Sequence, residues 1–496
     1  MNLSLMSLEI SVVALGLVVL LADLWLPAER KRMLGYAAAA ALTLLLVNTF
    51  TGHCSCASLG QSAFGGMFVQ DALSVFFKRL FLLAAVLVLV MAVEFSDRVA
   101  AGISEYYALI IFALAGMLFA ASANDFALLF VSIELITVTF YVLTSFTRGK
   151  VLSLEAGVKY LILGALSSAF MVYGIALVWG TTGKFNFSEL AMVSGRFAAA
   201  NNRVFLFGVL FILAGLGFKI AAFPFQFWTP DVYQGAPTPT TAFLAIGSKA
   251  AGFVLLLRFL FSAIPDVTAD WRNLLIVISG ITILYGNLCA LPQRNLKRLL
   301  GYSSIAHAGY VLLGVAAFAG AMANGKGPMA SDGGAAVLYY LSGYLFTVLA
   351  AFTVITLVMR HLDSEDVSGL AGLNHRSPLL AATLTLAMVS LAGIPPLAGF
   401  FGKFLLLKAV ILQGPANPGY YCLAFTVLAG VVISLYYYFG VIRAIYWSKD
   451  AAPRERICVS APMHAAIAIC IAGMFWLGLF PGTLLRWAET ATTVLK

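Results

Sequence analysis

Charged side chains are scarce in this 496-residue sequence. It has 30 Lys and Arg and 21 Asp and Glu, so 10% of the chain is charged, whereas a soluble domain carries roughly 25%. Hydrophobic residues make up 62% of it. So few charges cannot solubilise a particle of this size, which excludes a water-soluble enzyme, a disordered chain and a nucleic-acid-binding protein. The composition indicates an all-α polytopic membrane protein.

Cysteine is also rare, and the six residues in the chain provide no disulfide framework. Cys54 and Cys56 form a C-x-C pair of low specificity in an expected loop, and the role of this pair stays open. The sequence also lacks a haem-binding histidine pair, a C-x-x-C set, a glycine-rich nucleotide loop after a strand and a Ser/His/Asp arrangement. We therefore expect no redox or hydrolytic chemistry, no cofactor and no metal in this chain.

Apolar runs of about 20 residues recur along the whole chain, and each is long enough to cross roughly 30 Å of hydrocarbon. We predict about fourteen transmembrane helices joined only by loops, the longest of which cover residues 183–203 and 360–377. The predicted spans are 5–26, 33–50, 73–93, 105–123, 125–146, 155–180, 203–224, 237–262, 272–291, 296–320, 331–360, 377–397, 419–447 and 461–486.

The distribution of basic residues predicts the orientation of the chain. No basic segment precedes the first span, and Arg30, Lys31 and Arg32 follow it. This order is typical of a retained helix whose C-terminal end stays in the cytoplasm. Alternating the loops from there places both termini outside. The basic residues between Lys184 and Arg203 would then lie outside, against the tendency of basic residues to collect in cytoplasmic loops.

Two predicted spans are interrupted by proline in comparable settings, LGFKIAAFP at residues 216–224 and LAGIPP at residues 391–396. Pro224 and Pro396 lie 172 residues apart (396 − 224), an offset that maps the fourth to eighth spans onto the ninth to thirteenth. Because five is odd, the second copy would enter the membrane from the opposite side, as in transporters built from inverted repeats. Two unrelated proline kinks are the alternative. The expected division is a three-helix segment (1–100), a first five-helix repeat (101–265), an inverted second repeat (266–450) and a C-terminal helix (451–496), with one broken helix in each repeat.

Four ionisable residues inside these spans form the candidate site, namely Glu134, Lys219, Lys249 and Lys403. A charged residue at the centre of a membrane helix costs roughly 2.5–3.5 kcal/mol, so the four together would cost on the order of 10 kcal/mol without compensation. A marginally stable fold tolerates this cost only where the groups face a hydrated interior and pair with one another.

The chemistry of lysine suggests what such a row does. Burial favours the neutral amine, whereas a nearby carboxylate favours the ammonium. A Lys whose distance to Glu134 changes can therefore take up and release a proton, and Lys219, beside a helix break, is the best candidate for that pairing. We expect Lys249 to be the central relay group and Lys403, at the second break, to be the entry or exit group.

Other ionisable residues are weaker candidates. His307 could pass protons between Lys249 and Lys403, or its imidazole could be satisfied by nearby Ser hydroxyl groups. Lys297 could join the relay or serve as an ordinary cytoplasmic anchor. The remaining charges in the spans are expected to lie outside the relay, either in the first span or close enough to a span end to reach the interface: Glu9, Asp23, Lys78, Arg79, Arg258 and Lys408.

Three motifs resemble a known family. FPFQFWTPDVYQGAPTPT (residues 223–240) closely resembles the hallmark of subunit N of bacterial NADH-quinone oxidoreductase, respiratory complex I. KRLLGYSSIAH (297–307) and GIPPLAGFFGK (393–403) are similar to the tenth helix and the broken twelfth helix of that family. The resemblance covers the whole chain. It implies an antiporter-like fold of fourteen helices with two inverted repeats, in which Glu134, Lys219, Lys249 and Lys403 act in series.

The resemblance also implies a function. The chain would be a proton-translocating subunit of an enzyme that transfers electrons from NADH to quinone. NADH, FMN, iron–sulfur clusters and quinone are then expected in partner subunits. The expected partners are the antiporter-like subunits L and M, small subunits such as K, the hydrophilic NADH-oxidising arm and the lipid bilayer of the bacterial inner membrane.

Two alternatives remain at this stage. One is a subunit of a Mrp-type sodium/proton antiporter, and the other is a scaffold whose buried charges only hold helices together. The Lys-rich row lacks an obvious carboxylate cage, and hard cations such as Na⁺ prefer oxygen ligands, which speaks against the antiporter. The sibling subunit M is expected to carry Glu where this chain has Lys403, so subunit N is the better match.

Overall fold

The computed structural model describes residues 3–27, 30–51, 60–99, 102–325, 327–361, 365–448 and 456–495. Cys54 and Cys56 lie outside these described residues, as do the expected boundaries at 100/101 and 450/451.

Helices make up most of the described chain. The α-helices are α1 (Ser7–Ala22), α2 (Lys31–Thr51), α3 (Ala72–Phe95), α4 (Ile103–Ala121), α5 (Phe126–Thr144), α6 (Val151–Thr182), α7 (Phe187–Ala199), α8 (Arg203–Ile220), α9 (Trp228–Gly235), α10 (Thr238–Phe243), α11 (Lys249–Arg258), α12 (Pro265–Asp270), α13 (Arg272–Ala290), α14 (Leu296–Ala323), α15 (Gly327–Val358), α16 (Leu373–Arg376), α17 (Pro378–Ala392), α18 (Ala398–Ile411), α19 (Gly419–Trp447), α20 (Ala461–Leu479) and α21 (Pro481–Thr492). Two π-helical turns, Leu244–Ser248 and Phe259–Ala263, make α10 and α11 parts of one continuous span. Strands β1 (Gln61–Ala63) and β2 (Phe68–Gln70) form an antiparallel hairpin that pairs Ser62 with Val69.

Thirteen helical segments of the described chain are long and apolar enough to cross a membrane. The shorter apolar helix α17 and its continuation α18 form the broken helix predicted around Pro396. The all-α polytopic fold is therefore confirmed. Two larger differences from the prediction concern α7 and α21. Residues 187–199 of an expected loop form the helix α7, which Asn186 caps, and the last predicted span ends at Leu479, because α21 starts anew at Pro481.

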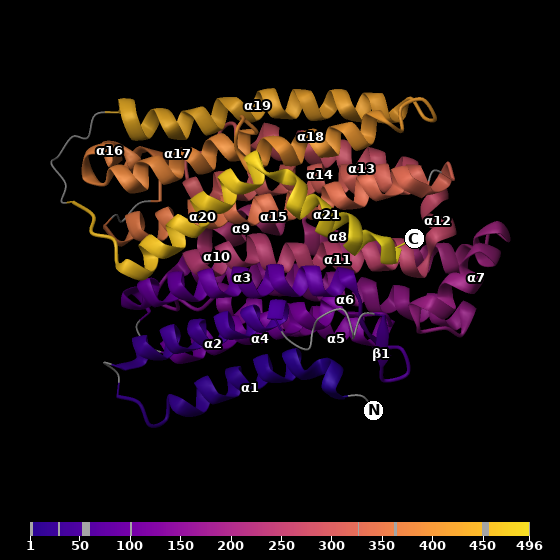
Figure 1. Cartoon of the computed structure of the whole chain (residues 1–496), viewed down its shortest axis with the longest axis horizontal. Coiled ribbons are helices and arrows are strands. Elements are labelled where there is room, and N and C mark those ends of the chain that lie inside the picture. Colours follow the sequence, from indigo (N-terminus) through magenta and orange to yellow (C-terminus); the bar gives the residue numbers. More distant parts are fainter. Residues whose placement is uncertain are drawn as a thin grey trace.

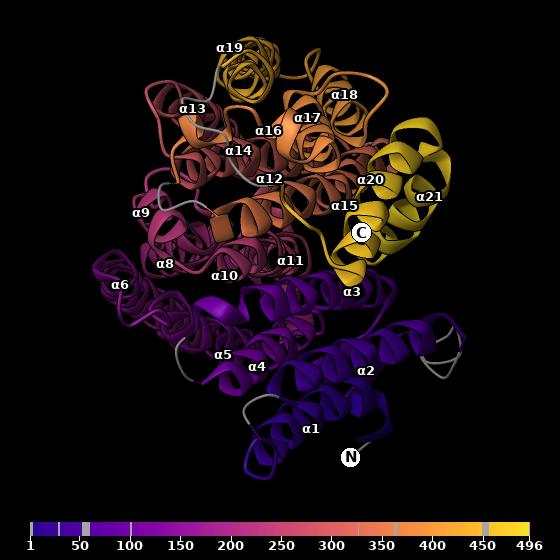
Figure 2. The same ribbon diagram turned by 90° about the vertical axis from the view of Figure 1, so that its left-hand side faces the viewer.

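The helices lie roughly parallel, and α1 begins and α21 ends at the same end of the bundle (Figure 1). Viewed along the helices, the chain runs from α1 and α2 at one edge, through α3 to α6, to α13 and α19 at the opposite edge (Figure 2). Burial follows this arrangement. Within the most apolar 18 residues of each span, all residues are buried in the span containing α11 and 94% are buried in the α14 and α15 spans, compared with 33% in α6. Most of the described side chains on α11, α14 and α15 are therefore enclosed by protein.

Two buried ion pairs correct the sequence interpretation, which had Lys78 and Arg258 reaching the interface. The Lys78 ammonium lies 2.7 Å from a Glu9 carboxylate oxygen, and both side chains are buried. The Arg258 guanidinium binds both carboxylate oxygens of Asp71, at 2.8 and 3.0 Å. Asp71 also caps α3 by accepting a hydrogen bond from Ser74 N. Pairing of this kind makes a buried charge tolerable, so these residues hold helices together inside the protein.

The two helix breaks have related backbones. The helix α8 is followed by the C-cap residue Ala221 and α17 by the C-cap residue Gly393, and both of these residues have left-handed backbone conformations, with φ values of 60° and 89°. The chain then passes Pro224 or Pro396 before it continues as α9 or α18. A break of this kind leaves the last carbonyl groups of the first half without helical partners. Each break must therefore recruit hydrogen-bond donors from elsewhere.

Candidate functional site

Lys219 lies in the last turn of α8, and its side chain is 5% exposed. Its ammonium donates a hydrogen bond to the Thr137 hydroxyl group on α5. Glu134 is one turn before Thr137 on the same helix, so the two residues share a helix face. The Glu134 carboxylate accepts a hydrogen bond from Ser168 on α6, and its charge acts on Lys219. Thr137 thus receives the hydrogen bond of a lysine that lies within the electrostatic reach of Glu134.

Lys249 begins α11, and its side chain is 3% exposed. Its Nζ atom donates to the Ser304 carbonyl oxygen at 2.7 Å and to the Ser304 hydroxyl at 2.5 Å. The hydroxyl group of Tyr233 on α9 lies 2.9 Å from the same Ser304 hydroxyl. The second half of the first broken helix therefore contacts the partner of the central lysine.

Close packing of α8 against α11 brings the first two lysines near each other. A Cβ atom on Gly252 would lie 3.2 Å from the Cβ atom of Lys219 and 2.8 Å from the Cγ2 atom of Ile220. Gly252 is three residues after Lys249, so it lies about one turn further along α11. Only a residue without a side chain fits this contact, which places Lys219 beside the α11 turn that follows Lys249.

His307 links three helices of the second half of the bundle through tyrosines. Its Nδ1 atom lies 2.5 Å from the Tyr340 hydroxyl on α15, and its Nε2 atom lies 3.1 Å from the Tyr438 hydroxyl on α19. The Tyr438 hydroxyl is also 2.5 Å from that of Ser303. The charges of Lys249 and Lys403 both act on the His307 ring. The imidazole is therefore held by tyrosine hydroxyls and lies within electrostatic reach of both lysines.

Sequence reasoning missed these tyrosines, although Tyr339-Tyr340 and Tyr436-Tyr437-Tyr438 stand in apolar runs. A buried phenol in a membrane helix needs a hydrogen-bond partner. Tyrosines in apolar runs therefore indicate buried polar partners, and this was the signal in the sequence. Tyr437 meets it through Asn287, at 2.9 Å.

Lys403 lies on α18, and its side chain is 7% exposed. Its ammonium donates to the carbonyl oxygens of Leu391 and Ala392 at 2.7 and 3.0 Å, which are the last carbonyls of α17. The same ammonium lies 5.1 Å from the centre of the Tyr310 ring. Lys403 therefore caps the broken helix of the second half from across the break.

Lys297 lies apart from this row. Its ammonium donates to the Ala236 carbonyl oxygen at 2.8 Å and to the Glu365 carboxylate at 3.0 Å. Both side chains line a cavity of about 350 Å³ that Arg98 and Lys150 also line. Lys297 is buried and ion-paired at one end of the bundle, whereas the other lysines are held by hydroxyl and carbonyl oxygens.

Asp231 on α9, outside the thirteen spans, joins three helices at that same end. Its carboxylate accepts hydrogen bonds from Lys159 on α6 and Arg298 on α14, at 2.6 and 2.5 Å. Burial acts to raise the pKa of Asp231, but the hydrogen bonds from Lys159 and Arg298 outweigh it and hold this pKa below its usual value. In the sequence, Asp231 stands out only as part of the motif at residues 223–240.

The candidate side chains, which we call the row, comprise the buried Lys219, Lys249, His307 and Lys403 and the half-buried Glu134. A charged row inside a membrane has to be shielded from lipid, and each amine in it needs an oxygen partner. An all-helical bundle with two broken helices and such a row is an antiporter-like membrane protein in its architecture.

Comparison with known proteins identifies the family. Residues 123–434 match the family described as "NADH:quinone oxidoreductase/Mrp antiporter, TM". The chain is 39% identical to NADH-quinone oxidoreductase subunit N of Heliobacterium modesticaldum, over 100% of this chain and 99% of that protein. It is 40% identical to the subunit N of Desulfitobacterium hafniense, with the same coverage. The chain therefore belongs to the subunit N family of NADH-quinone oxidoreductases, a branch of the antiporter-like membrane subunits.

Solved structures agree with this assignment. A chain of respiratory complex I from Thermus thermophilus with bound aureothin is 32% identical, with a TM-score of 0.76, over 97% of this chain and 98% of that chain. A chain of the Mrp complex from Dietzia sp. DQ12-45-1b has a TM-score of 0.83 at 21% identity, over 99% of this chain and 98% of that chain. The Mrp likeness extends to the fold alone.

Proposed function

We propose that this chain moves protons across the bacterial inner membrane as a subunit of a proton-translocating NADH:quinone oxidoreductase. Electron transfer from NADH to quinone in partner subunits drives the movement, and the protons pass along Glu134, Lys219, Lys249, His307 and Lys403. The observation that carries the proposal is that Lys219, Lys249, His307 and Lys403 are all buried and that each has an oxygen partner.

The step at the first break follows from the Lys219 environment. When the Glu134 carboxylate comes close, it favours the ammonium form of Lys219, and when it withdraws, burial favours the neutral amine. The released proton then has the next basic group, Lys249, beside it across the Gly252 contact. Thr137 and Ser168 are the hydroxyl groups that hold Lys219 and Glu134 between these states.

The second half receives the proton through His307. Hydroxyl groups of Ser304, Tyr340 and Tyr438 can each donate and accept a hydrogen bond, so they can pass a proton between nitrogen bases. Lys403 is the last basic group of the row and exchanges its proton with one side of the membrane. Lys297 lies off this line, and we assign it to the polar cavity at the end of the bundle.

The assembly and orientation follow from the family. We propose that the antiporter-like subunits L and M and small subunits such as K flank this chain, that the hydrophilic arm supplies the NADH, FMN, iron–sulfur and quinone chemistry, and that both termini face the periplasm. The division into two inverted five-helix repeats, 101–265 and 266–450, belongs to the same proposal. The pair of helices α6 and α15, with 32 residues each before the two broken helices, supports it.

A sodium/proton antiporter is the competing function. Its cargo would need a set of oxygen ligands, as hard cations do. The row contains three lysine ammonium groups, which repel Na⁺ and suit proton exchange. This chemistry favours protons as the transported species.

Replacing Lys219 tests the function directly. We expect Lys219→Ala to leave the complex assembled and to reduce quinone-coupled turnover at least tenfold, because removing a general acid–base group typically costs 10²–10⁴-fold. The matched control is Lys184→Ala, which removes an exposed lysine paired with Glu189 and should leave turnover unchanged. Lys297→Ala should reduce turnover less than Lys219→Ala. Normal turnover together with normal proton pumping by the Lys219 variant in reconstituted vesicles would reject the relay.

A further inference from the structure

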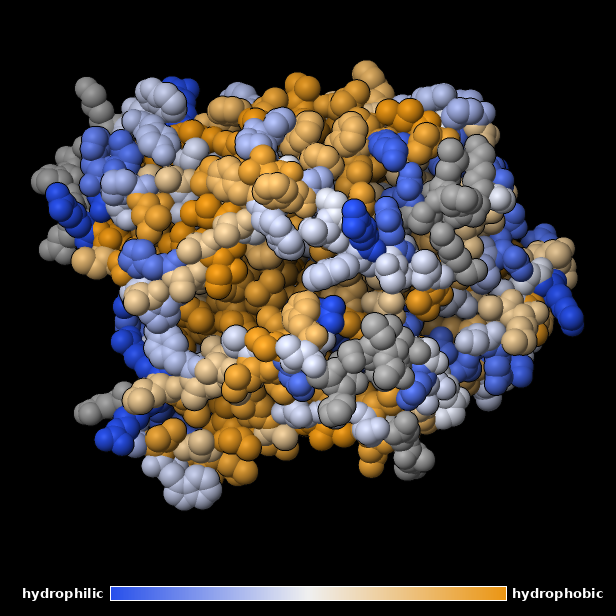
Figure 3. Space-filling model, viewed as in Figure 1, coloured by the Kyte–Doolittle hydropathy of each residue, from blue (hydrophilic) through white to orange (hydrophobic). Residues whose placement is uncertain are grey.

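A large apolar cavity opens on the outer face of the bundle, away from the relay. It has a volume of about 510 Å³ and lies between α2 and α3 on one side and α15, α20 and α21 on the other. Figure 3 shows a hollow with a hydrophobic floor in this region. Among its described lining residues, Arg79 is the one charged side chain, and Ser342 and Thr490 are polar. The volume falls within the range of about 300–1,000 Å³ that is usual for ligand pockets.

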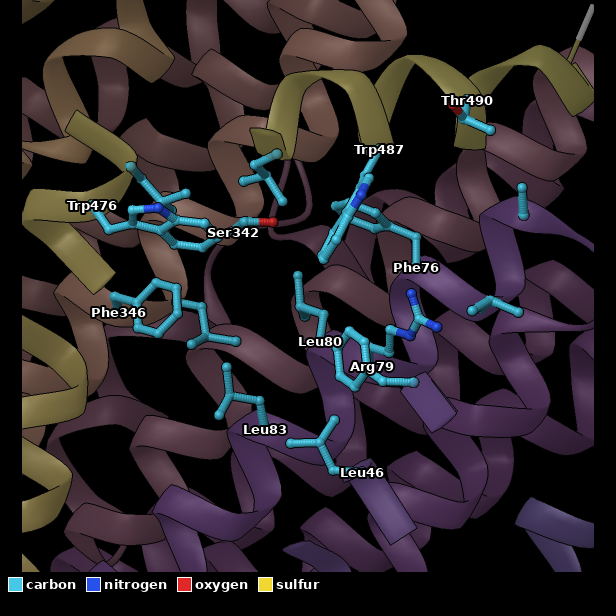
Figure 4. Close-up of a pocket in the computed structure, with 16 residues that line it drawn as sticks. Leu46, Phe76, Arg79, Leu80, Leu83, Ser342, Phe346, Trp476, Trp487 and Thr490 are labelled. Atoms are coloured by element: carbon cyan, nitrogen blue, oxygen red, sulfur yellow. The ribbon is translucent and has the colours of Figure 1, made fainter. Parts of the chain in front are cut away.

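Arg79 is fixed on the wall of this cavity (Figure 4). Its Nη2 atom donates to the Thr49 carbonyl oxygen at 2.6 Å, and its Nε atom donates to the Thr49 hydroxyl at 3.3 Å. The guanidinium carbon lies 4.1 Å from the centre of the Phe50 ring and 6.0 Å from that of Trp487. These contacts hold the planar guanidinium group in one orientation beside the apolar space.

The position of Arg79 along α3 brings it within reach of the membrane interface. It lies seven residues after the start of α3, or roughly 10 Å along the helix axis. An Arg at such a depth extends its charged head toward the headgroup layer. Trp476 and Trp487 also line the cavity, and tryptophan is enriched at that layer.

We propose that this cavity is a binding site for an anionic phospholipid. One acyl chain fills the apolar space between α3 and α15, and the phosphate group binds the Arg79 guanidinium. An apolar void next to hydrocarbon loses dispersion contacts unless a chain fills it. The guanidinium group matches the geometry of a phosphate and binds it more specifically than an ammonium does.

The site lies behind the relay. Ser342 and Phe346 line the cavity from α15, and Tyr340 on the same helix contacts His307. A bound acyl chain therefore packs against the outer face of α15, the helix whose Tyr340 contacts His307. The lipid site itself does not depend on proton transfer, so its occupancy can be measured separately.

Photocrosslinking of the whole complex tests the site. Leu83, which lines the cavity, is replaced by the photoreactive residue p-benzoylphenylalanine, and the complex is reconstituted in vesicles of equal parts phosphatidylglycerol and phosphatidylcholine. After irradiation, mass spectrometry identifies the adducts. We expect phosphatidylglycerol to exceed phosphatidylcholine about fivefold, the ratio that one basic residue near an anionic lipid provides.

Two comparisons separate this site from bulk lipid. The same photoreactive residue at Val432, which is exposed on α19, should label both lipids equally. Adding Arg79→Gln should reduce the Leu83 ratio to this bulk value, and Arg79→Lys should restore part of it. Equal labelling at Leu83 in the otherwise unmodified complex would overturn the proposal. Adducts with a peptide of another subunit would also overturn it, because they would show that protein covers the cavity.

Discussion

The two broken helices solve the same backbone problem with different residues. In the first break, the indole Nε1 of Trp228 donates to the Phe218 carbonyl oxygen at 2.9 Å, and Lys219 points its ammonium to Thr137 on another helix. In the second break, Lys403 itself donates to the last two carbonyls of α17. The lysine precedes the break in one case and follows it in the other.

The difference suggests different roles for the two lysines. The negative end of a helix dipole attracts a nearby cation, so the Leu391 and Ala392 carbonyls hold the Lys403 ammonium in place at the end of α17. At the first break, Trp228 donates the hydrogen bond to the Phe218 carbonyl oxygen, so Lys219 does not cap its own helix. The proton affinity of Lys219 can therefore follow its distance to Glu134. We infer that Lys219 is the switching group and that Lys403 combines proton exchange with structural support.

Lys403→Met should show the largest effect on both properties. The variant keeps the length of the side chain but removes the donor, so the Leu391 and Ala392 carbonyls lose their ammonium partner. We expect a loss of about 2 kcal/mol in stability, because a hydrogen bond from a charged group is worth about 1.5–3 kcal/mol, and a strong loss of quinone-coupled turnover. Thermal inactivation of the purified complex measures the first effect and a turnover assay the second.

The same helix provides the control for that experiment. Lys408 on α18 is exposed and lies 3.3 Å from Asp332, and exposed pairs contribute little. Lys408→Met should therefore retain stability and turnover. If Lys403→Met lost turnover but kept the thermal midpoint of the wild type, the carbonyl cap would have no structural role and the contrast with Lys219 would disappear.

Gly393→Ala should have the next largest effect. Gly393 has a φ of 89°, and an added Cβ atom would lie 2.9 Å from Cδ and 3.3 Å from Nζ of Lys403. The left-handed backbone alone costs a non-glycine residue about 1–2 kcal/mol, and the contact displaces the capping lysine. We expect lower stability and lower turnover than in Gly440→Ala, where an added Cβ meets nothing within 4 Å. Equal behaviour of the two variants would contradict the close fit at the second break.

Much of the fold could be predicted from the sequence, because apolar runs of fixed length determine membrane spans. The two breaks were also visible, and Glu134, Lys219, Lys249 and Lys403 could be selected as relay candidates, since charges and prolines are conspicuous in apolar helices. What the sequence could not predict were partners from distant segments. Arg258 binds Asp71, which is 187 residues earlier, and His307 binds Tyr438, which is 131 residues later. Hydrophobic periodicity has no information on such pairs, so Lys78 and Arg258 were wrongly placed at the interface.

Gly252→Ala should have a moderate effect at the first half of the row. The added Cβ atom would lie 2.8 Å from Ile220 and 3.2 Å from Lys219, and overpacking of this kind costs about 1–3 kcal/mol. The α8 and α11 helices would have to separate, which lengthens the step from Lys219 to Lys249. We expect turnover to fall while the complex stays assembled, as measured by quinone-coupled activity per assembled complex. Unchanged turnover would show that protons do not cross between these two helices at this contact.

Ala221→Gly, the reverse of the Gly393 substitution, should have the smallest effect. Glycine relieves the left-handed strain of Ala221, worth about 1–2 kcal/mol. It also removes a buried methyl group, worth about 0.8 kcal/mol, and adds about 0.5–1 kcal/mol of chain entropy to the unfolded state. These contributions nearly cancel, so the thermal midpoint and the turnover should both stay close to those of the wild type. A loss as large as that of Gly393→Ala would mean that the first break depends on its own residues as strictly as the second does.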